Sequence, residues 1–339
     1  MVPDIEKRTQ PIFLSIIFSF RNEEEVLPEL IKRTREVLGK EKERGHITSH
    51  ELIFVNDDST DTSLDILLDH SKDVDDIRII TMSRCFGISE CVLAGMQYSS
   101  GDAIVYMDAD LQDPPEIIHE LLDEFFNDQE VTIVHTRRRT RRGESKIKLF
   151  LTGIAYTILN RITQVQLPKE AGDFKLLSRR AVVHLLKFRE KRPYLRGLIY
   201  WMGFKQRFVE YDREARFAGT TKFPVLSLKV ISNFTDSALI SFSSVPLKLA
   251  SVFGLVAIGI DLILMCHALF QKLSGNAIPG WTAIMVVTLF LGGVQLFCLG
   301  IIGLYLNAII EQERDRPRYI ISKTFGFPAQ PSKQELNNP

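Results

Sequence analysis

The sequence predicts an α/β protein: a doubly wound, mostly parallel sheet, followed by helices that associate with a membrane. In the first 140 residues, short runs rich in Ile, Val and Phe alternate with segments of helical periodicity, as in a parallel sheet whose strands are buried on both faces. Further along, residues 249–270 contain one charge, Asp261, and residues 282–310 contain none, although 25% of the 339 residues are charged.

Five strands are expected in the first part of the chain, at residues 12–20, 51–56, 77–83, 103–108 and 131–136. Apolar residues recur at three- and four-residue spacing from Leu27 to Leu38, which predicts a helix with one apolar face. Residues 58–61 can cap the next helix, and residues 113–116 start another, with prolines where the first turn tolerates them. Ligands of such sheets bind beyond the carboxyl ends of the strands, so functional residues are expected in the loops there.

The two stretches with one charge or none predict a transmembrane hairpin. Each is long enough to cross a hydrocarbon core, which takes about 20 helical residues. Their proximity favours a hairpin over the buried helices of a soluble protein. The connecting loop carries one basic residue, Lys272, whereas basic residues are frequent before and after the pair, so both termini are expected in the cytoplasm. Asp261 is interpreted as a polar contact between helices or subunits, and a functional role for it stays open.

These patterns divide the chain into four parts. Residues 1–224 are expected to form the cytoplasmic α/β domain, and residues 225–246 amphipathic helices along the membrane surface. Residues 247–310 hold the two transmembrane helices, and residues 311–339 form a cytoplasmic tail. The zero net charge argues against a nucleic-acid-binding protein. The four cysteines form no Cys-x-x-Cys pair, so neither a disulfide framework nor a zinc site is expected.

A candidate metal site follows the fourth strand. Asp108 and Asp110 come directly after an apolar run, and Gln112 lies two residues further on. Hard oxygen ligands suit Mg²⁺ or Mn²⁺, and a small number of protein ligands leaves positions for substrate phosphates. An Asp-x-Asp alone is common and can equally cap a helix. The loops after the first two strands add Asn22 and Asp58 at the same sheet edge, and three such loops together favour a ligand site.

A series of further motifs extends along the chain. They lie at residues 20–24, 56–61, 83–87 and 101–116, and then at residues 172–179, 195–197, 216–223 and 303–306. The first four resemble family 2 glycosyltransferases of the GT-A fold. The later four narrow the resemblance to polyisoprenyl-phosphate glycosyltransferases, especially bactoprenol glucosyltransferases and, more distantly, dolichyl-phosphate mannose synthases. The likeness extends over residues 12–322.

The resemblance implies a role for each matching residue. Asp108, Asp110 and Gln112 match the positions that hold the divalent metal, Mg²⁺ or Mn²⁺, and the donor diphosphate. Asp110 and Asp173 are the candidate catalytic residues. The candidate contacts to the nucleotide sugar are Phe20, Asn22, Glu23, Asp58, Arg84 and Asp108. The candidate contacts to a lipid phosphate are Arg138, Arg141, Arg216 and Lys222.

Chemistry agrees with these roles. A divalent cation stabilises the charge that grows on a departing nucleotide diphosphate, and a guanidinium can bind a phosphate with two parallel hydrogen bonds. A lipid phosphate is already largely ionised at neutral pH, so it needs placement more than proton removal. Asp173 is therefore either a base or a residue that orients an arginine or contacts the sugar. The arginine-rich run at residues 137–142 can also be a solvated face or bind anionic headgroups.

The expected function is an inverting transfer of one sugar, glucose from UDP-glucose, to a polyprenyl phosphate of the undecaprenyl type at the cytoplasmic face of the cell membrane. A GDP-mannose-dependent polyprenyl-phosphate mannose synthase is the alternative enzyme, and a catalytically silent membrane scaffold is the alternative from another class. All three acidic loops are present, which argues against a protein without catalytic activity. Small residues in the second apolar stretch allow close helix packing, and the resembling family includes tetramers, so a homotetramer is expected.

Overall fold

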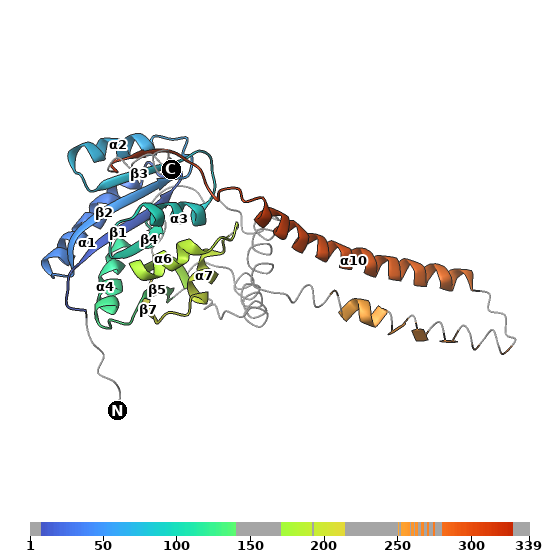
Figure 1. The fold of residues 1–339 in the computed structure, drawn as a ribbon. Coiled ribbons are helices and arrows are strands. Elements are labelled where there is room, and N and C mark those ends of the chain that lie inside the picture. Colours follow the sequence, from blue (N-terminus) through green and yellow to red (C-terminus); the bar gives the residue numbers. More distant parts are fainter. Residues whose placement is uncertain are drawn as a thin grey trace, which may run out of the picture. The chain divides into compact units, whose positions relative to one another are not determined.

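The computed structural model describes residues 8–139, 171–191, 193–213 and 280–327, together with scattered residues between 250 and 274. The chain divides into two compact units. The first contains residues 1–157, 165–225 and 317–339, and the second contains residues 158–164 and 226–316. The sheet lies in the first unit and contains residues from all three of its segments (Figure 1).

The described strands form one eight-stranded sheet in the order β7-β5-β6-β4-β1-β2-β3-β8. Their bounds are β1 Ile12–Phe20, β2 Ile47–Asn56, β3 Ile77–Met82, β4 Ala103–Asp108, β5 Ile133–Arg138, β6 Ala171–Ser178, β7 Gln206–Tyr211 and β8 Ile321–Phe325. Strands β1 to β4 are parallel, as are β5 and β7. Strand β6 is antiparallel to its neighbours β4 and β5, and β8 is antiparallel to β3. The predicted mostly parallel α/β sheet is confirmed.

Helices cover both faces of this sheet. In the first unit they are α1 Leu27–Glu43, α2 Ser63–Asp73, α3 Ile88–Tyr98, the short 3₁₀ helix η1 Pro115–Ile117, α4 Ile118–Phe126, α6 Arg179–Lys187 and α7 Leu195–Trp201. Alternate residues of a strand face opposite sides. Phe18 joins the core beneath α1 and α4, whereas Ile17 faces α3, where a Cβ on Gly95 would lie 2.5 Å from the Ile17 side chain.

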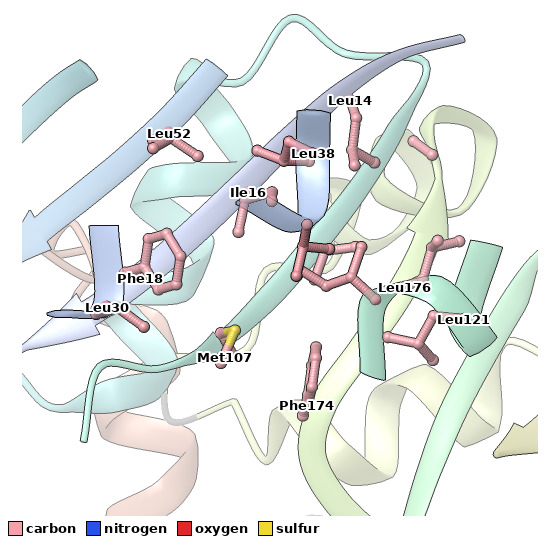
Figure 2. Packing of buried hydrophobic residues seen from close by; sticks show 14 of the residues in the cluster. Leu14, Ile16, Phe18, Leu30, Leu38, Leu52, Met107, Leu121, Phe174 and Leu176 are labelled. Carbon is pink, nitrogen blue, oxygen red and sulfur yellow. The ribbon is translucent and has the colours of Figure 1, made fainter. Parts of the chain in front are cut away.

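The larger core lies between the sheet and helices α1 and α4. Figure 2 shows Leu30 of α1 next to Phe18 of β1, and Leu121 of α4 next to Leu176 of β6. Phe18 stacks on Phe54 of β2 with the ring centroids 4.8 Å apart. This packing fixes the strands against each other and therefore fixes the relative positions of the loops at their carboxyl ends.

The sequence predicts β1 and β4 to the residue, and α1 covers the predicted apolar periodicity. Helix α2 begins at Ser63, and Asp61 of the predicted capping residues accepts hydrogen bonds from the Ser63 amide at 3.1 Å and the Ser63 hydroxyl at 2.8 Å. The residue at the N-cap position is Thr62, which makes no side-chain cap bond, because Glu24 from the loop after β1 accepts hydrogen bonds from the Thr62 amide at 3.0 Å and the Thr62 hydroxyl at 2.6 Å.

Three strands of the sheet were not predicted. Strands β6 and β7 lie in the part of the chain whose sequence is basic and mixed, and β8 lies in the expected C-terminal tail. Because β8 pairs with the edge strand β3, residues that follow the long apolar helix complete the sheet. The first compact unit is therefore not one continuous stretch ending at residue 224.

The second unit contains α10, which runs from Trp281 to Glu313 and confirms a helix over residues 282–310. Within the described part of the chain, one window is apolar and long enough to cross a membrane, Phe290–Asn307 in this helix. The first expected span is described only in part, and its described residues are helical. Asp261 and the expected amphipathic helices at residues 225–246 lie outside the described residues. The two-helix hairpin stays a prediction.

Candidate active site

Strained backbone marks the loops at the carboxyl edge of the sheet. Asn22, Asp58 and Leu111 have φ values of 54°, 61° and 53°, in the left-handed region that residues other than glycine seldom adopt. They follow β1, β2 and β4, which are neighbours in the sheet. Such strain persists where the surrounding structure enforces it, and it is enriched at functional sites. The structure therefore supports the edge that the sequence analysis selected.

The loops after β1 and β2 are joined by hydrogen bonds. The Asn22 amide donates to the Ser59 hydroxyl at 3.0 Å, and the Asn22 side-chain oxygen accepts from the Thr60 amide at 2.8 Å. The Glu23 amide donates to the Ser63 hydroxyl at 2.9 Å. Asn22 and Glu23 thus belong to the framework of the site, and their predicted contacts to a nucleotide sugar stay predictions.

Phe20 lies beneath this framework. Its side chain is 4% exposed and packs edge-on against Phe54, with ring centroids 6.4 Å apart. The Phe20 carbonyl accepts a hydrogen bond from the Asp57 amide at 3.0 Å. The Phe20 side chain therefore belongs to the core, and the predicted contact of Phe20 to a nucleotide sugar stays a prediction.

Asp57 joins the loop after β2 to the loop after β3. One carboxylate oxygen accepts from the Phe86 amide at 2.7 Å, and the other accepts from the Gly87 amide at 3.0 Å and from the Cys85 thiol at 3.2 Å. The Arg21 guanidinium in turn donates to the Cys85 sulfur at 3.2 Å. We call Arg21, Asp57, Cys85, Phe86 and Gly87 the Asp57 cluster.

The predicted residues Asp58 and Arg84 flank this cluster. Asp58 is exposed next to the buried Asp57. The Arg84 guanidinium lies 4.1 Å from the centre of the Phe86 ring and donates to the Cys85 carbonyl at 3.1 Å. Since the oxygens of Asp57 are occupied by the protein, Asp58 is the carboxylate of this pair that faces solvent.

The loop after β4 carries the predicted metal ligands. Asp108 is partly buried at the end of the strand, and one of its carboxylate oxygens lies 3.3 Å from the Ser19 hydroxyl. Asp110 accepts a hydrogen bond from the backbone amide of Gln112 at 3.1 Å. Burial, together with the negative charges of Asp173, Asp110 and Asp113, raises the pKa of Asp108 to about 7. Four carboxylates therefore act on one another across this loop.

Asp113 is the centre of a second cluster. Its side chain is 2% exposed and accepts from the Tyr211 hydroxyl, with Arg213 Nε at 3.1 Å and Arg138 Nη2 at 3.9 Å. The Arg213 guanidinium also approaches Asp110, with 4.0 Å between the nearest nitrogen and oxygen. We call Asp113, Arg138, Tyr211 and Arg213 the Asp113 cluster. It joins the loop after β4 to the ends of β5 and β7.

Asp173 near the start of β6 is bound by an arginine from α7. The Arg196 guanidinium donates to both of its carboxylate oxygens, at 3.1 Å and 2.5 Å. Burial alone would raise the pKa of Asp173, but Arg196, Lys175 and Arg138 outweigh it and hold that pKa at about 2. A carboxylate held in this way is ionised and oriented at neutral pH, which favours the orienting role over that of a base.

Comparison with known families identifies the kind of protein to which this site belongs. Residues 15–186 match the model of glycosyl transferase family 2. The uncharacterised glycosyltransferase YkcC of Bacillus subtilis is 40% identical over 314 residues, which cover 92% of this chain and 94% of the relative. The chain belongs to glycosyl transferase family 2. The prophage bactoprenol glucosyl transferase homolog of Escherichia coli is 31% identical over 313 residues, covering 91% of this chain and 98% of the relative.

Among solved structures, glucosyl-3-phosphoglycerate synthase of Mycobacterium tuberculosis aligns with a TM-score of 0.48 and 17% identity, over 68% of this chain and 78% of that one. So distant a likeness carries no argument about substrates. The family membership establishes a glycosyltransferase with a GT-A-like, mostly parallel sheet.

In this glycosyltransferase the structure brings Asp108, Asp110, Asp173 and Arg138 to one edge of the sheet. Arg141, Arg216 and Lys222 lie outside the described residues. Five further residues of the site were not predicted from the sequence: Asp57, Asp113, Arg196, Tyr211 and Arg213. Asp57 and Asp113 were visible in the acidic loops as neighbours of the chosen residues, and Arg196 lies in a recognised motif. Tyr211 and Arg213 carry no local signal, because their relation to Asp113 arises only when β7 pairs with β5.

The residues after β4 fit a divalent metal as part of a shared ligand set. Among the described His, Cys, Asp and Glu residues, no group of three or more is placed to hold a metal on its own. The two carboxylates of Asp108 and Asp110 and the amide of Gln112 are hard oxygen donors of the kind that Mg²⁺ and Mn²⁺ prefer. A donor diphosphate would supply the remaining oxygens.

Proposed function

We propose that this glycosyltransferase transfers one sugar from a nucleotide sugar to a polyprenyl phosphate, with inversion at the anomeric carbon. UDP-glucose is the proposed donor and an undecaprenyl-type phosphate the proposed acceptor, because relatives that align along more than nine-tenths of their length are named bactoprenol glucosyl transferases. The proposed product is a polyprenyl-phosphate-linked sugar. The alternative is a GDP-mannose-dependent enzyme of the same type, and a panel of nucleotide-sugar donors distinguishes the two.

In the proposed reaction, an oxygen of the lipid phosphate attacks the anomeric carbon from the side opposite the nucleotide. The bond from that carbon to the donor diphosphate breaks, and its electron pair leaves on the diphosphate. A phosphate is already ionised at neutral pH, so no base has to remove a proton. A Mg²⁺ or Mn²⁺ ion held by Asp108, Asp110 and Gln112 would supply positive charge to the departing diphosphate.

The observation that carries this proposal is the placement of cations opposite the carboxylate loop. Arg138, Arg196 and Arg213 come from three different elements, and each is held by a carboxylate of the same sheet edge. Guanidinium groups oriented in this way suit a phosphate, because their N–H donors lie in a fixed plane. We assign Arg138, with Arg141, Arg216 and Lys222, to the acceptor phosphate, and Asp58, Arg84 and the Asp57 cluster to the donor nucleotide.

A membrane location follows from the same proposal, because a polyprenyl chain is confined to a bilayer. Helix α10 supports it: Leu296 is 72% exposed and Ile309 is 63% exposed, which is costly in water and favourable in lipid. We propose that the sheet-containing unit and both termini lie in the cytoplasm, on a two-helix anchor. A homotetramer is proposed from the glycines of the second span, and crosslinking in native membranes that yields only monomers would reject it.

The test is direct. Membranes containing the full chain are incubated with a radiolabelled nucleotide sugar, Mg²⁺ and undecaprenyl phosphate, and the lipid is extracted into organic solvent. Label from UDP-glucose in a lipid that is labile to mild acid is the expected result. A panel with UDP-glucose, UDP-galactose and GDP-mannose identifies the donor. Absence of labelled lipid with every donor, from protein shown to be folded, would contradict the proposed function and favour the silent scaffold.

A further inference from the structure

Lys175 is a buried cation at the base of the candidate active site. It lies on β6 two residues after Asp173, so both side chains are on the same face of the strand. Lys175 is fully buried, at 0% exposure, and is among the largest fully buried side chains of the protein. An ammonium group is costly to bury unless charges or hydrogen bonds compensate it, so its presence here requires an explanation.

The neighbouring strands provide little compensation. Strand β6 runs between β4 and β5, and Lys175 is in register with Tyr106 on one side and His135 on the other. Its ammonium lies 3.4 Å from the Tyr106 hydroxyl. His135 stacks on Tyr200 of α7 with ring centroids 4.3 Å apart, and burial together with Lys175 lowers its pKa well below the ordinary value. Both neighbours are therefore uncharged at neutral pH.

Asp173 is the carboxylate that acts on Lys175. Burial lowers the pKa of Lys175 to about 7, against the influence of Asp173, which raises it. In the opposite direction, Lys175 is one of three cations that keep Asp173 ionised. The Asp173 side chain is 43% exposed and reaches the site, where Arg196 holds it with two hydrogen bonds. Arg196 thus binds the Asp173 carboxylate directly, whereas Lys175 acts on it by charge from the same face of β6.

We propose that Lys175 is a positioning residue: its buried ammonium, on the same face of β6 as Asp173, supports the charged Asp173 carboxylate, which holds Arg196 of α7 at the sheet edge where sugar transfer takes place. The proposal rests on the proposed function, because it assigns Arg196 to the placement of a phosphorylated substrate. Lys175 itself is buried and does not contact substrate. Its effect passes through Asp173 to the arginine.

The arrangement makes the rate of transfer sensitive to pH. The titratable groups that face Lys175 are Tyr106 from β4, His135 from β5, Asp173 from β6, and Arg196 and Tyr200 from α7. Tyr106 and Tyr200 have pKa values raised by burial, and both stay neutral around pH 7. Lys175 is therefore the group of this set that changes charge near pH 7. As the pH rises through about 7, the positioning charge is lost.

The experiment compares the full-length protein with Lys175→Met, which retains the stem and removes the charge. Transfer of labelled sugar to polyprenyl phosphate is measured from pH 6 to pH 9, together with the thermal midpoint. We expect kcat at pH 6.5 to fall at least about tenfold, the KM for the nucleotide sugar to stay within about twofold, and the alkaline decline of the wild type to disappear. The exposed Lys187→Met on α6 is the matched control and should behave as the wild type does.

The thermal midpoint separates positioning from a structural role. Burial of the Lys175 ammonium costs free energy, as its lowered pKa shows, so Lys175→Met should lose activity without losing stability. A kcat and pH profile equal to those of the wild type, or a loss of activity that parallels a loss of stability, would overturn the proposal. If Lys175→Met does not fold, Lys175→Arg gives the test: its alkaline decline must move to higher pH, and an unmoved decline overturns the proposal.

A stability profile distinguishes failure of this inference from failure of the proposed function. The pKa of Lys175 in the folded protein lies below its unfolded value of 10.5, so the unfolded chain binds more protons between about pH 7 and pH 10. Stability of the wild type should therefore rise with pH in this window relative to Lys175→Met. No substrate is needed for this measurement. If stability changes with pH equally in the wild type and in Lys175→Met, the inference is overturned. If the stability of the wild type rises as expected but no lipid-linked product forms, the proposed function alone is overturned.

Discussion

The Asp57 and Asp113 clusters are built in different ways at the same edge of the sheet. In the Asp57 cluster, a carboxylate is bound by two backbone amides and a thiol from the next loop. In the Asp113 cluster, a carboxylate is bound by a tyrosine and two arginines that come from β5 and from the end of β7. The first is a short-range arrangement of neighbouring loops, and the second depends on charged side chains from distant parts of the chain.

The difference is consistent with the proposed division of the site between donor and acceptor. Asp57 fixes the Phe86 and Gly87 amides beside the exposed Asp58, in the region proposed for the nucleotide. Asp113 and Asp173 hold the guanidinium groups of three arginines, Arg138, Arg196 and Arg213, whose planar N–H donors suit a phosphate. Asp108 and Asp110 lie at the end of β4, which stands between β2 and β5 in the sheet order. Variants in the three regions should therefore change different kinetic constants.

The largest effect is expected at the predicted metal ligands after β4. Asp110→Asn should lower kcat at least about a hundredfold with an unchanged thermal midpoint, because a neutral amide cannot supply the charge that a divalent cation requires. Removal of divalent ions by EDTA should have the same effect on the wild type and should be reversed by Mg²⁺ or Mn²⁺. Asp65→Asn, at an exposed position in the first turn of α2, is the control. Full activity of metal-free protein would reject the metal assignment.

In the Asp113 cluster, Arg138→Ala should raise the KM for the lipid phosphate about 30-fold, as expected for loss of a hydrogen bond to a charged group. Hydrolysis of the donor by water should change little, since water needs no phosphate site. The measurement is the ratio of transfer to hydrolysis at saturating nucleotide sugar. An equal fall of both rates, with weaker nucleotide-sugar binding, would assign Arg138 to the donor and remove the proposed division.

In the Asp57 cluster, Asp57→Asn should raise the KM for the nucleotide sugar about tenfold and lower the free energy of unfolding by about 2 kcal/mol, because at least one buried N–H donor loses its acceptor. The exposed neighbour variant Asp58→Asn should raise the same KM without loss of stability. Steady-state kinetics and urea unfolding of the two variants give the comparison. Equal stability losses would show that the two carboxylates do not divide structure and binding between them.

The smallest effect on activity is expected far from both clusters, at Asp76. Burial raises the pKa of this carboxyl, but hydrogen bonds from His50 and Arg35 outweigh it and hold the pKa at about 2. The folded pKa is below the unfolded value of 3.8, so the stabilisation is present above about pH 4 and is lost as the pH falls through about 2. Asp76→Asn should cost about 2 kcal/mol of unfolding free energy at pH 7, little at pH 2, and no activity.

The parallel half of the fold could be predicted from the sequence alone. Runs such as residues 12–20 and 103–108 are apolar throughout, because parallel strands are buried on both faces and tolerate few polar residues. Their carboxyl ends therefore identify the functional edge, and Asp108 and Asp110 could be selected from the strand that precedes them. The uncharged run at residues 282–310 determined helix α10 for a similar reason, since length and composition suffice for it.

The tertiary structure alone determined which of these carboxylates are buried and which side chains they bind. Asp57 and Asp58 are adjacent and chemically identical, yet Asp57 is buried against the next loop while Asp58 is exposed with a left-handed backbone. Asp113 and Arg213 lie a hundred residues apart and meet because β7 pairs with β5. Strand β8 joins β3 from beyond α10 in the same manner. Such partners follow from strand order and register, which long-range packing determines and which no local pattern of residues encodes.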